Sequence, residues 1–114
     1  MKNLKLIITT LVVGLVSLAT ISSATGQTAS SKLGAKVFED NCSPCHAKGE
    51  NTVEAAKTLK AAALKENGFN GVADIKARVE QGKGVMPVFK NQLKAAEIDA
   101  VAGYVWDKAQ SNWK

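Results

Sequence analysis

Five consecutive residues near the middle of the chain constrain its fold more than any others: Cys42, Ser43, Pro44, Cys45 and His46. The 114-residue chain has no other cysteine and no other histidine. Two cysteines this close together cannot join distant parts of the chain. A domain this small nevertheless usually needs disulfides, a metal or a cofactor to supplement its core. The pattern C-x-x-C-H is typical of covalent haem attachment, and a haem would meet that need.

The spacing within this motif has a chemical reason. Cys42 and Cys45 can each form a thioether with one of the two vinyl groups on the same porphyrin edge, and His46 then becomes an axial ligand of the iron. A thioredoxin-like dithiol would require a neighbouring βαβ pattern, and a zinc site would require further Cys or His ligands. A disulfide closing so short a loop would add little stability. The motif therefore predicts one covalent haem c.

The second axial ligand decides what such a haem can do. Met86, in Gly84-Val85-Met86-Pro87, is the candidate, because Met1 is expected to be removed and lysines are protonated at neutral pH. Pro87 stiffens the loop that carries the sulfur. The alternative is that Met86 only fills a gap in the core. We expect ligation by Met86, which indicates electron transfer, whereas an open sixth position would indicate a haem-based peroxidase or gas sensor.

The first 26 residues have the layout of a secretory signal peptide. Lys2 and Lys5 precede an apolar run over residues 6–18, and small residues follow from position 22. The run is shorter than the ~18 residues that a spanning helix needs, which argues against a retained membrane anchor. We expect cleavage within residues 24–29, export of the chain, and a single folded domain over residues 27–114.

Hydrophobic periodicity predicts an all-α domain, because no segment shows the alternation of a half-buried strand. The last helix is the clearest, with apolar residues spaced at i, i+3, i+4, i+7 and i+8 from Ile98. Ser30 or Ser31 is expected to cap the first helix, which leads into Cys42. The other helices are expected over residues 59–66, 72–81 and 95–109, with loops over residues 48–53 and 83–91.

The net charge of +5 comes from scattered lysines. There is no dense basic block, and aromatic residues are not interleaved with basic ones, so nucleic-acid binding is not expected. The lysines are read as a solvated surface that could also steer the protein toward an acidic partner.

Several segments of the domain resemble class I cytochromes c, most closely the cytochrome c6 group or a cytochrome c6-like paralogue. These segments are 34–38, 57–64, 81–87 and 97–105, together with Trp113. The resemblance implies about four helices wrapped around one covalent haem. It also implies that Gly34 and Phe38 cross the last helix near Val101 and Tyr104.

The resemblance further implies an electron-transfer protein rather than an enzyme. Such a protein would be a soluble monohaem carrier of the thylakoid lumen or bacterial periplasm, and a monomer without stable membrane insertion. Its donor would be a cytochrome b6f-type complex. Its acceptor would be photosystem I or a terminal oxidase.

Overall fold

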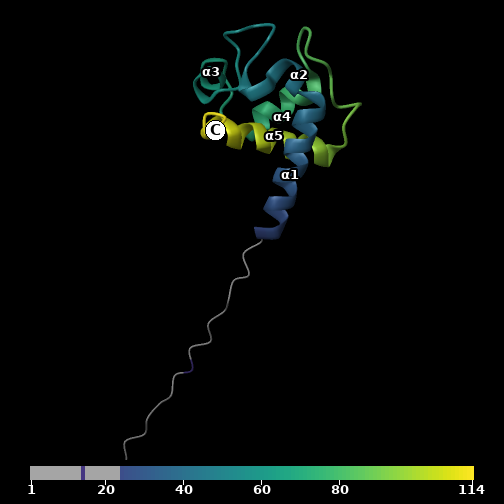
Figure 1. Cartoon of the computed structure of the whole chain (residues 1–114). Coiled ribbons are helices and arrows are strands. Elements are labelled where there is room, and N and C mark those ends of the chain that lie inside the picture. The colour runs from purple at the N-terminus through teal and green to yellow at the C-terminus, as the bar shows by residue number, and fades with distance from the viewer. Residues whose placement is uncertain (1–13, 15–23) are drawn as a thin grey trace, which may run out of the picture.

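The computed structural model describes Gly14 and residues 24–114, and the remaining residues are drawn as a thin trace (Figure 1). The expected signal peptide, residues 1–26, therefore falls almost entirely outside the described residues. Within the described part, no helix is both long enough and apolar enough to cross a membrane.

The described residues form helices joined by loops and contain no strand, which confirms the predicted all-α fold. The only sheet-like contact among them is an isolated bridge between Lys83 and Met86. In chain order the elements are α1 (Ala24–Asn41), α2 (Ser43–His46), the 3-10 turn η1 (Ala47–Gly49), α3 (Ala61–Glu66), α4 (Val72–Gln81) and α5 (Ala95–Gln110).

The first helix differs most from expectation, because α1 begins at Ala24 and not after Ser30 or Ser31. The two serines lie inside the helix and their side chains are exposed. No proline precedes them, and Gly26 costs a helix only about 1 kcal/mol, so nothing local forces the helix to begin later. The bounds of α4 match the prediction, α3 starts two residues later than expected, and α5 ends one residue later.

Helices α1 and α5 cross in the body of the domain, and α4 packs against α5 as well (Figure 1). Gly34 lies at the crossing: a Cβ atom there would collide with the Ala100 carbonyl oxygen and lie 2.7 Å from Cβ of Tyr104. The ring centroids of Phe38 and Tyr104 are 5.5 Å apart. The expected crossing of the first and last helices is therefore confirmed.

The hydrophobic core forms where α1, α3, α4 and α5 meet. Val101, fully buried, lies within this core, and the predicted apolar face of α5 points into it, with Trp106 half-buried beside it. The buried core residues are Val37, Phe38, Leu64, Ile75, Val79, Phe89, Ile98, Val101, Ala102, Val105 and Ala109. Cys42 and Met86 are partly buried and pack against the same cluster, so the fold brings two of the candidate site residues to one core.

Candidate haem site

The cysteine motif lies at the break between α1 and α2. The Cys42 N–H still donates to the Phe38 carbonyl at 2.8 Å, as in a continuing helix, and the His46 N–H donates to the Cys42 carbonyl at 2.8 Å. Between them, Pro44 occupies the first turn of α2, where its missing N–H costs nothing. The short helix therefore presents Cys42, Cys45 and His46 within one turn.

Cys42 and Cys45 form no disulfide; Cys42 is half-buried and Cys45 is exposed. Burial raises the pKa of the Cys42 thiol to about 11. A reactive dithiol works through a thiolate with a lowered pKa, so Cys42 does not have the character of an oxidoreductase nucleophile. The described residues also contain no strand, so they lack the βαβ pattern of a thioredoxin-like site.

The imidazole of His46 is fixed by the backbone that follows it. Its Nδ1 lies 2.9 Å from the carbonyl oxygen of Glu50. A carbonyl can only accept, so this contact selects the tautomer with the proton on Nδ1 and leaves Nε2 free for a metal. A metal-bound histidine commonly donates its second ring N–H in this way, which fixes the ring orientation and raises its basicity.

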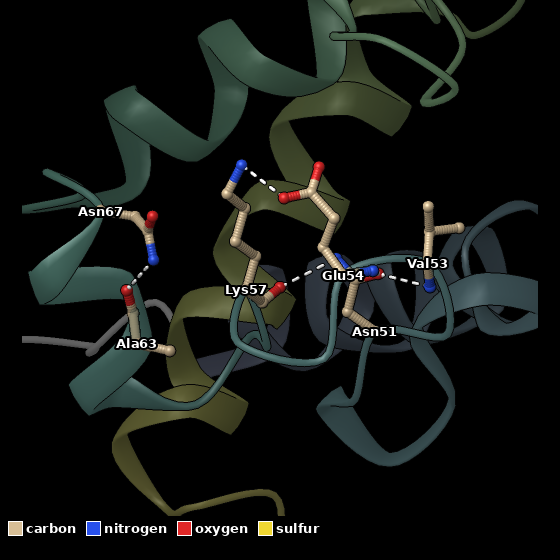
Figure 2. Close-up of polar contacts among 6 residues, drawn as sticks. All are labelled: Asn51, Val53, Glu54, Lys57, Ala63 and Asn67. Carbon is tan, nitrogen blue, oxygen red and sulfur yellow. Dashed lines mark hydrogen bonds and ion pairs between the residues drawn. The ribbon is translucent and has the colours of Figure 1, made fainter.

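The loop after His46 is organised by Asn51, a residue that the sequence analysis did not single out (Figure 2). Its Oδ1 accepts from the N–H groups of Val53 and Glu54 at 2.9 and 2.8 Å, and its Nδ2 donates to the Lys57 carbonyl at 2.9 Å. Glu54 and Lys57 also form an ion pair at 2.5 Å, which lowers the pKa of the Glu54 carboxyl. An asparagine that begins a polar loop is a known turn signal, and this property could have predicted its role.

Met86 lies in a turn that two glycines make possible. Its N–H donates to the Lys83 carbonyl at 3.0 Å, and its carbonyl accepts from the Lys83 N–H at 3.2 Å. Gly82 has a φ of +61°, and a Cβ there would lie 2.5 Å from the Met86 carbonyl oxygen. Gly84, with a φ of +58°, closes the turn. The backbone of Met86 is thus fixed while its side chain stays half-buried.

Two loops approach each other on the side of the domain that carries the motif. Lys83, in the Met86 turn, contributes to lowering the pKa of Glu54 in the loop after His46, so these two segments lie within electrostatic range. In Figure 1 the two loops extend from the same side of the helical body. The segment that follows His46 and the turn that carries Met86 therefore lie on one side of the domain.

The donor set on this side of the domain fits a haem c. It consists of two cysteines three positions apart that form no disulfide, a histidine with one ring nitrogen available, and a thioether in a fixed turn. Across the described residues, no three His, Cys, Asp or Glu side chains gather as a site for a bare metal ion would require. The assignment of Cys42, Cys45, His46 and Met86 as ligands stays a prediction.

The arrangement of helices and site corresponds to a class I cytochrome c, and comparisons with known proteins agree. Residues 29–105 match the family model described as cytochrome c oxidase, cbb3-type, subunit III. The chain is 43% identical to cytochrome c6 from Synechococcus sp. (strain ATCC 27167 / PCC 6312) over 96% of this chain and 98% of that protein. It is 49% identical to cytochrome c6 from Nostoc sp. over 71% of this chain and 73% of that protein.

Solved structures show the same relationship. Cytochrome c6 from the diatom Phaeodactylum tricornutum superposes with a TM-score of 0.71 and 36% identity, covering 73% of this chain and 98% of that chain. Cytochrome c6C from Synechococcus sp. PCC 7002 gives a TM-score of 0.67 and 40% identity, covering 69% of this chain and 96% of that chain. The chain belongs to the cytochrome c6 family; it is an electron carrier with one covalently bound haem c.

Proposed function

We propose that this chain is a soluble, monomeric one-electron carrier of photosynthetic electron transport. It accepts electrons from a cytochrome b6f-type complex and delivers them to photosystem I, or to a terminal oxidase. The observation that carries the proposal is the similarity to cytochrome c6 of Synechococcus sp., which extends over 96% of this chain.

Four side chains are proposed to hold the haem. Cys42 and Cys45 form the thioethers, and His46 and Met86 are the axial ligands of the iron. Support comes from the spacing of Cys42 and Cys45, which form no disulfide, from the His46 Nδ1 contact with the backbone, and from the glycine-shaped turn around Met86. When bound, the haem supplies an iron that exchanges one electron between its ferrous and ferric states.

Backbone hydrogen bonds position two of the proposed ligands. The Glu50 carbonyl holds the His46 imidazole at 2.9 Å, and paired hydrogen bonds to Lys83 hold the Met86 backbone. Groups that are already in place need no rearrangement when the charge of the iron changes. A thioether ligand also raises the reduction potential relative to two nitrogen ligands.

Docking to membrane complexes is supported by apolar side chains next to Met86. Val85 is 75% exposed and Val88 is 47% exposed, and both belong to the loop that carries Met86. Exposed apolar residues that cluster on a small protein favour contact with a partner. A weak, largely apolar contact suits a carrier that has to dissociate after each transfer.

The proposal is tested by the rate at which the reduced holoprotein re-reduces photosystem I after a flash. We expect a second-order reaction that Val85→Ser slows severalfold. Val72→Ser is the matched control, because Val72 is a 39% exposed valine on α4, outside the Met86 loop. Reduction of a terminal oxidase but not of photosystem I would assign the oxidase as acceptor, and failure with both would contradict the proposed route.

The route also requires export to the thylakoid lumen or the bacterial periplasm, by way of the signal peptide proposed for residues 1–26. N-terminal sequencing of the protein isolated from its native source should begin after one of residues 24–29. A membrane-bound protein that retains Met1 would instead be an anchored carrier.

A further inference from the structure

We propose that Trp113 is a positioning residue for His46, holding in place the loop whose Glu50 carbonyl orients the imidazole. This inference rests on the proposed function, because it takes His46 as an iron ligand. The hydrogen bond of the Trp113 indole goes to the backbone of Leu59. Trp113 acts through the backbone of the loop that begins at Gly49 and returns at Leu59.

The indole of Trp113 is bonded to this loop. Its Nε1–H donates to the carbonyl of Leu59 at 2.9 Å, and the Leu59 N–H donates to the carbonyl of Gly49 at 2.7 Å. These two bonds connect the segment after α5 to both ends of the loop. The indole therefore closes the loop at its base, while Asn51 organises its tip.

Gly49 lies directly against the indole. It is buried, and a Cβ atom there would lie 2.5 Å from Cδ1 and Cε2 of Trp113. Its φ of +77° is a conformation that other residues rarely adopt. The Cα of Gly49, which precedes the peptide to Glu50, is thus packed against the indole of Trp113.

Glu50 transmits this contact to the histidine. Its N–H donates to the Ala47 carbonyl at 3.1 Å, and its own carbonyl lies 2.9 Å from His46 Nδ1. The direction of that carbonyl depends on the backbone of residues 49 and 50. The Nδ1–H bond sets both the orientation and the basicity of a metal-bound imidazole. Displacing the Glu50 carbonyl would therefore change the reduction potential of the iron as well as the loop.

Trp113 is itself held firmly enough to act as a support. Its ring packs 5.1 Å from the centroid of Phe38 and 6.2 Å, edge to face, from that of Tyr104. The backbone N–H of Trp113 donates to the Lys108 carbonyl at 2.7 Å. Asn112 and Trp113 have φ values of +54° and +60°, a conformation that side chains disfavour and that surrounding contacts have to maintain.

The test replaces Trp113 with Phe in the holoprotein, which keeps an aromatic ring against Phe38 and removes the N–H donor. We expect the His46 Nδ1–H of the ferrous protein to exchange with solvent several times faster, measured by NMR. The midpoint potential should rise, because a less basic imidazole stabilises ferric iron less. A threefold to tenfold change in the redox equilibrium corresponds to about 30 to 59 mV for one electron.

Trp106→Phe is the matched control. Trp106 is the other tryptophan of the chain; it lies on α5, is half-buried and packs on the same core, but its indole makes no hydrogen bond in the described part of the chain. This variant should lower the unfolding temperature without moving the exchange rate or the potential. If Trp113→Phe changes these two quantities no more than Trp106→Phe does, Trp113 only packs the core and the inference is wrong.

Gly49→Ala tests the same contact from the loop side and serves if Trp113→Phe yields no holoprotein. Its Cβ would displace the indole, so the same rise in potential and faster exchange are expected. The wild-type spectrum separates this inference from the proposed function. Ring-proton shifts of an iron-bound histidine in the wild type, with no effect of either variant, would overturn only the inference. Their absence in the wild type would overturn the ligand assignment as well.

Discussion

Met86 is held by its backbone more than by burial of its side chain. The paired hydrogen bonds with Lys83 and the close approach of Gly82 to the Met86 carbonyl fix the position of the Met86 backbone. The half-buried thioether packs against the core. A methionine that only filled a gap in the core would need no such turn. At the scale of single residues, this turn is the feature that most favours an electron carrier over a haem with an open position.

Replacing Met86 with Ala is expected to leave the sixth position of the iron open. The ferric protein should lose the weak charge-transfer absorption band of an iron–thioether bond and should bind added cyanide. The ferrous protein should bind added carbon monoxide. The potential should fall by more than about 59 mV, the equivalent of a tenfold change in the one-electron equilibrium. Absorption spectra and potentiometric titration measure all three effects.

Val85→Ala provides the control for this prediction, because Val85 is adjacent to Met86 and is 75% exposed. It should leave the band, the potential and ligand binding unchanged. A wild-type protein that lacks the band and binds cyanide as readily as the Met86 variant has an open site. That result would favour the peroxidase or gas-sensor alternative.

The elements are arranged by one close helix crossing. Because Gly34 has no side chain, α1 approaches α5 until Gly34 lies against the Ala100 carbonyl. This contact places Cys42, which follows the end of α1, against the core. Gly103 on α5 is a contrasting case. A Cβ at Gly103 would find no atom within 4 Å, so the packing provides no reason for a glycine there.

Gly34→Ala should therefore destabilise the protein, whereas Gly103→Ala should stabilise it. The first change forces α1 and α5 apart, at an expected cost of about 1–3 kcal/mol in the free energy of unfolding. The second replaces a glycine inside a helix and should gain about 0.5–1 kcal/mol. Denaturant unfolding of the two holoproteins gives both values, and a stabilising Gly34→Ala would refute the close crossing.

We expect the whole molecule to depend on the covalent haem to complete a small core. The buried residues come mainly from α1, α4 and α5, with Leu64 of α3 and Phe89 of the loop after α4, and a domain of this size is marginal without additional support. The Cys42–His46 motif, where we propose that the haem is attached, lies at the junction of α1 and α2 and packs on that core through Cys42. Haem attachment and folding should therefore be coupled.

The double variant Cys42→Ala/Cys45→Ala should release its haem into acidified acetone, and its polypeptide should have the mass of the bare chain. Its free energy of unfolding should fall by several kcal/mol, because haem without a covalent link can leave the chain when it unfolds. Ser43→Ala, between the two cysteines, should keep the covalent haem. Haem that remains attached in the double variant would place the thioethers elsewhere.

Local sequence patterns were sufficient for the features that depend on neighbouring residues. The 3.6-residue periodicity predicted α4 with its observed bounds and α5 to within one residue, and Asn67-Gly68 ended α3 as expected. The C-x-x-C-H motif and the single remaining methionine nominated the whole candidate donor set. These signals are local, because a helix face, a turn or a thioether pair is determined by residues a few positions apart.

The tertiary structure decided what depends on distant parts of the chain meeting. Neither the bond from Trp113 to Leu59, which spans 54 positions, nor the loop that Asn51 organises follows from local periodicity. The start of α1 at Ala24 was likewise missed, because a capping residue marks a helix start only if the preceding residues leave the helix. The crossing at Gly34 came from family resemblance alone. Such contacts form only after the helices pack, so the local sequence pattern does not predict them.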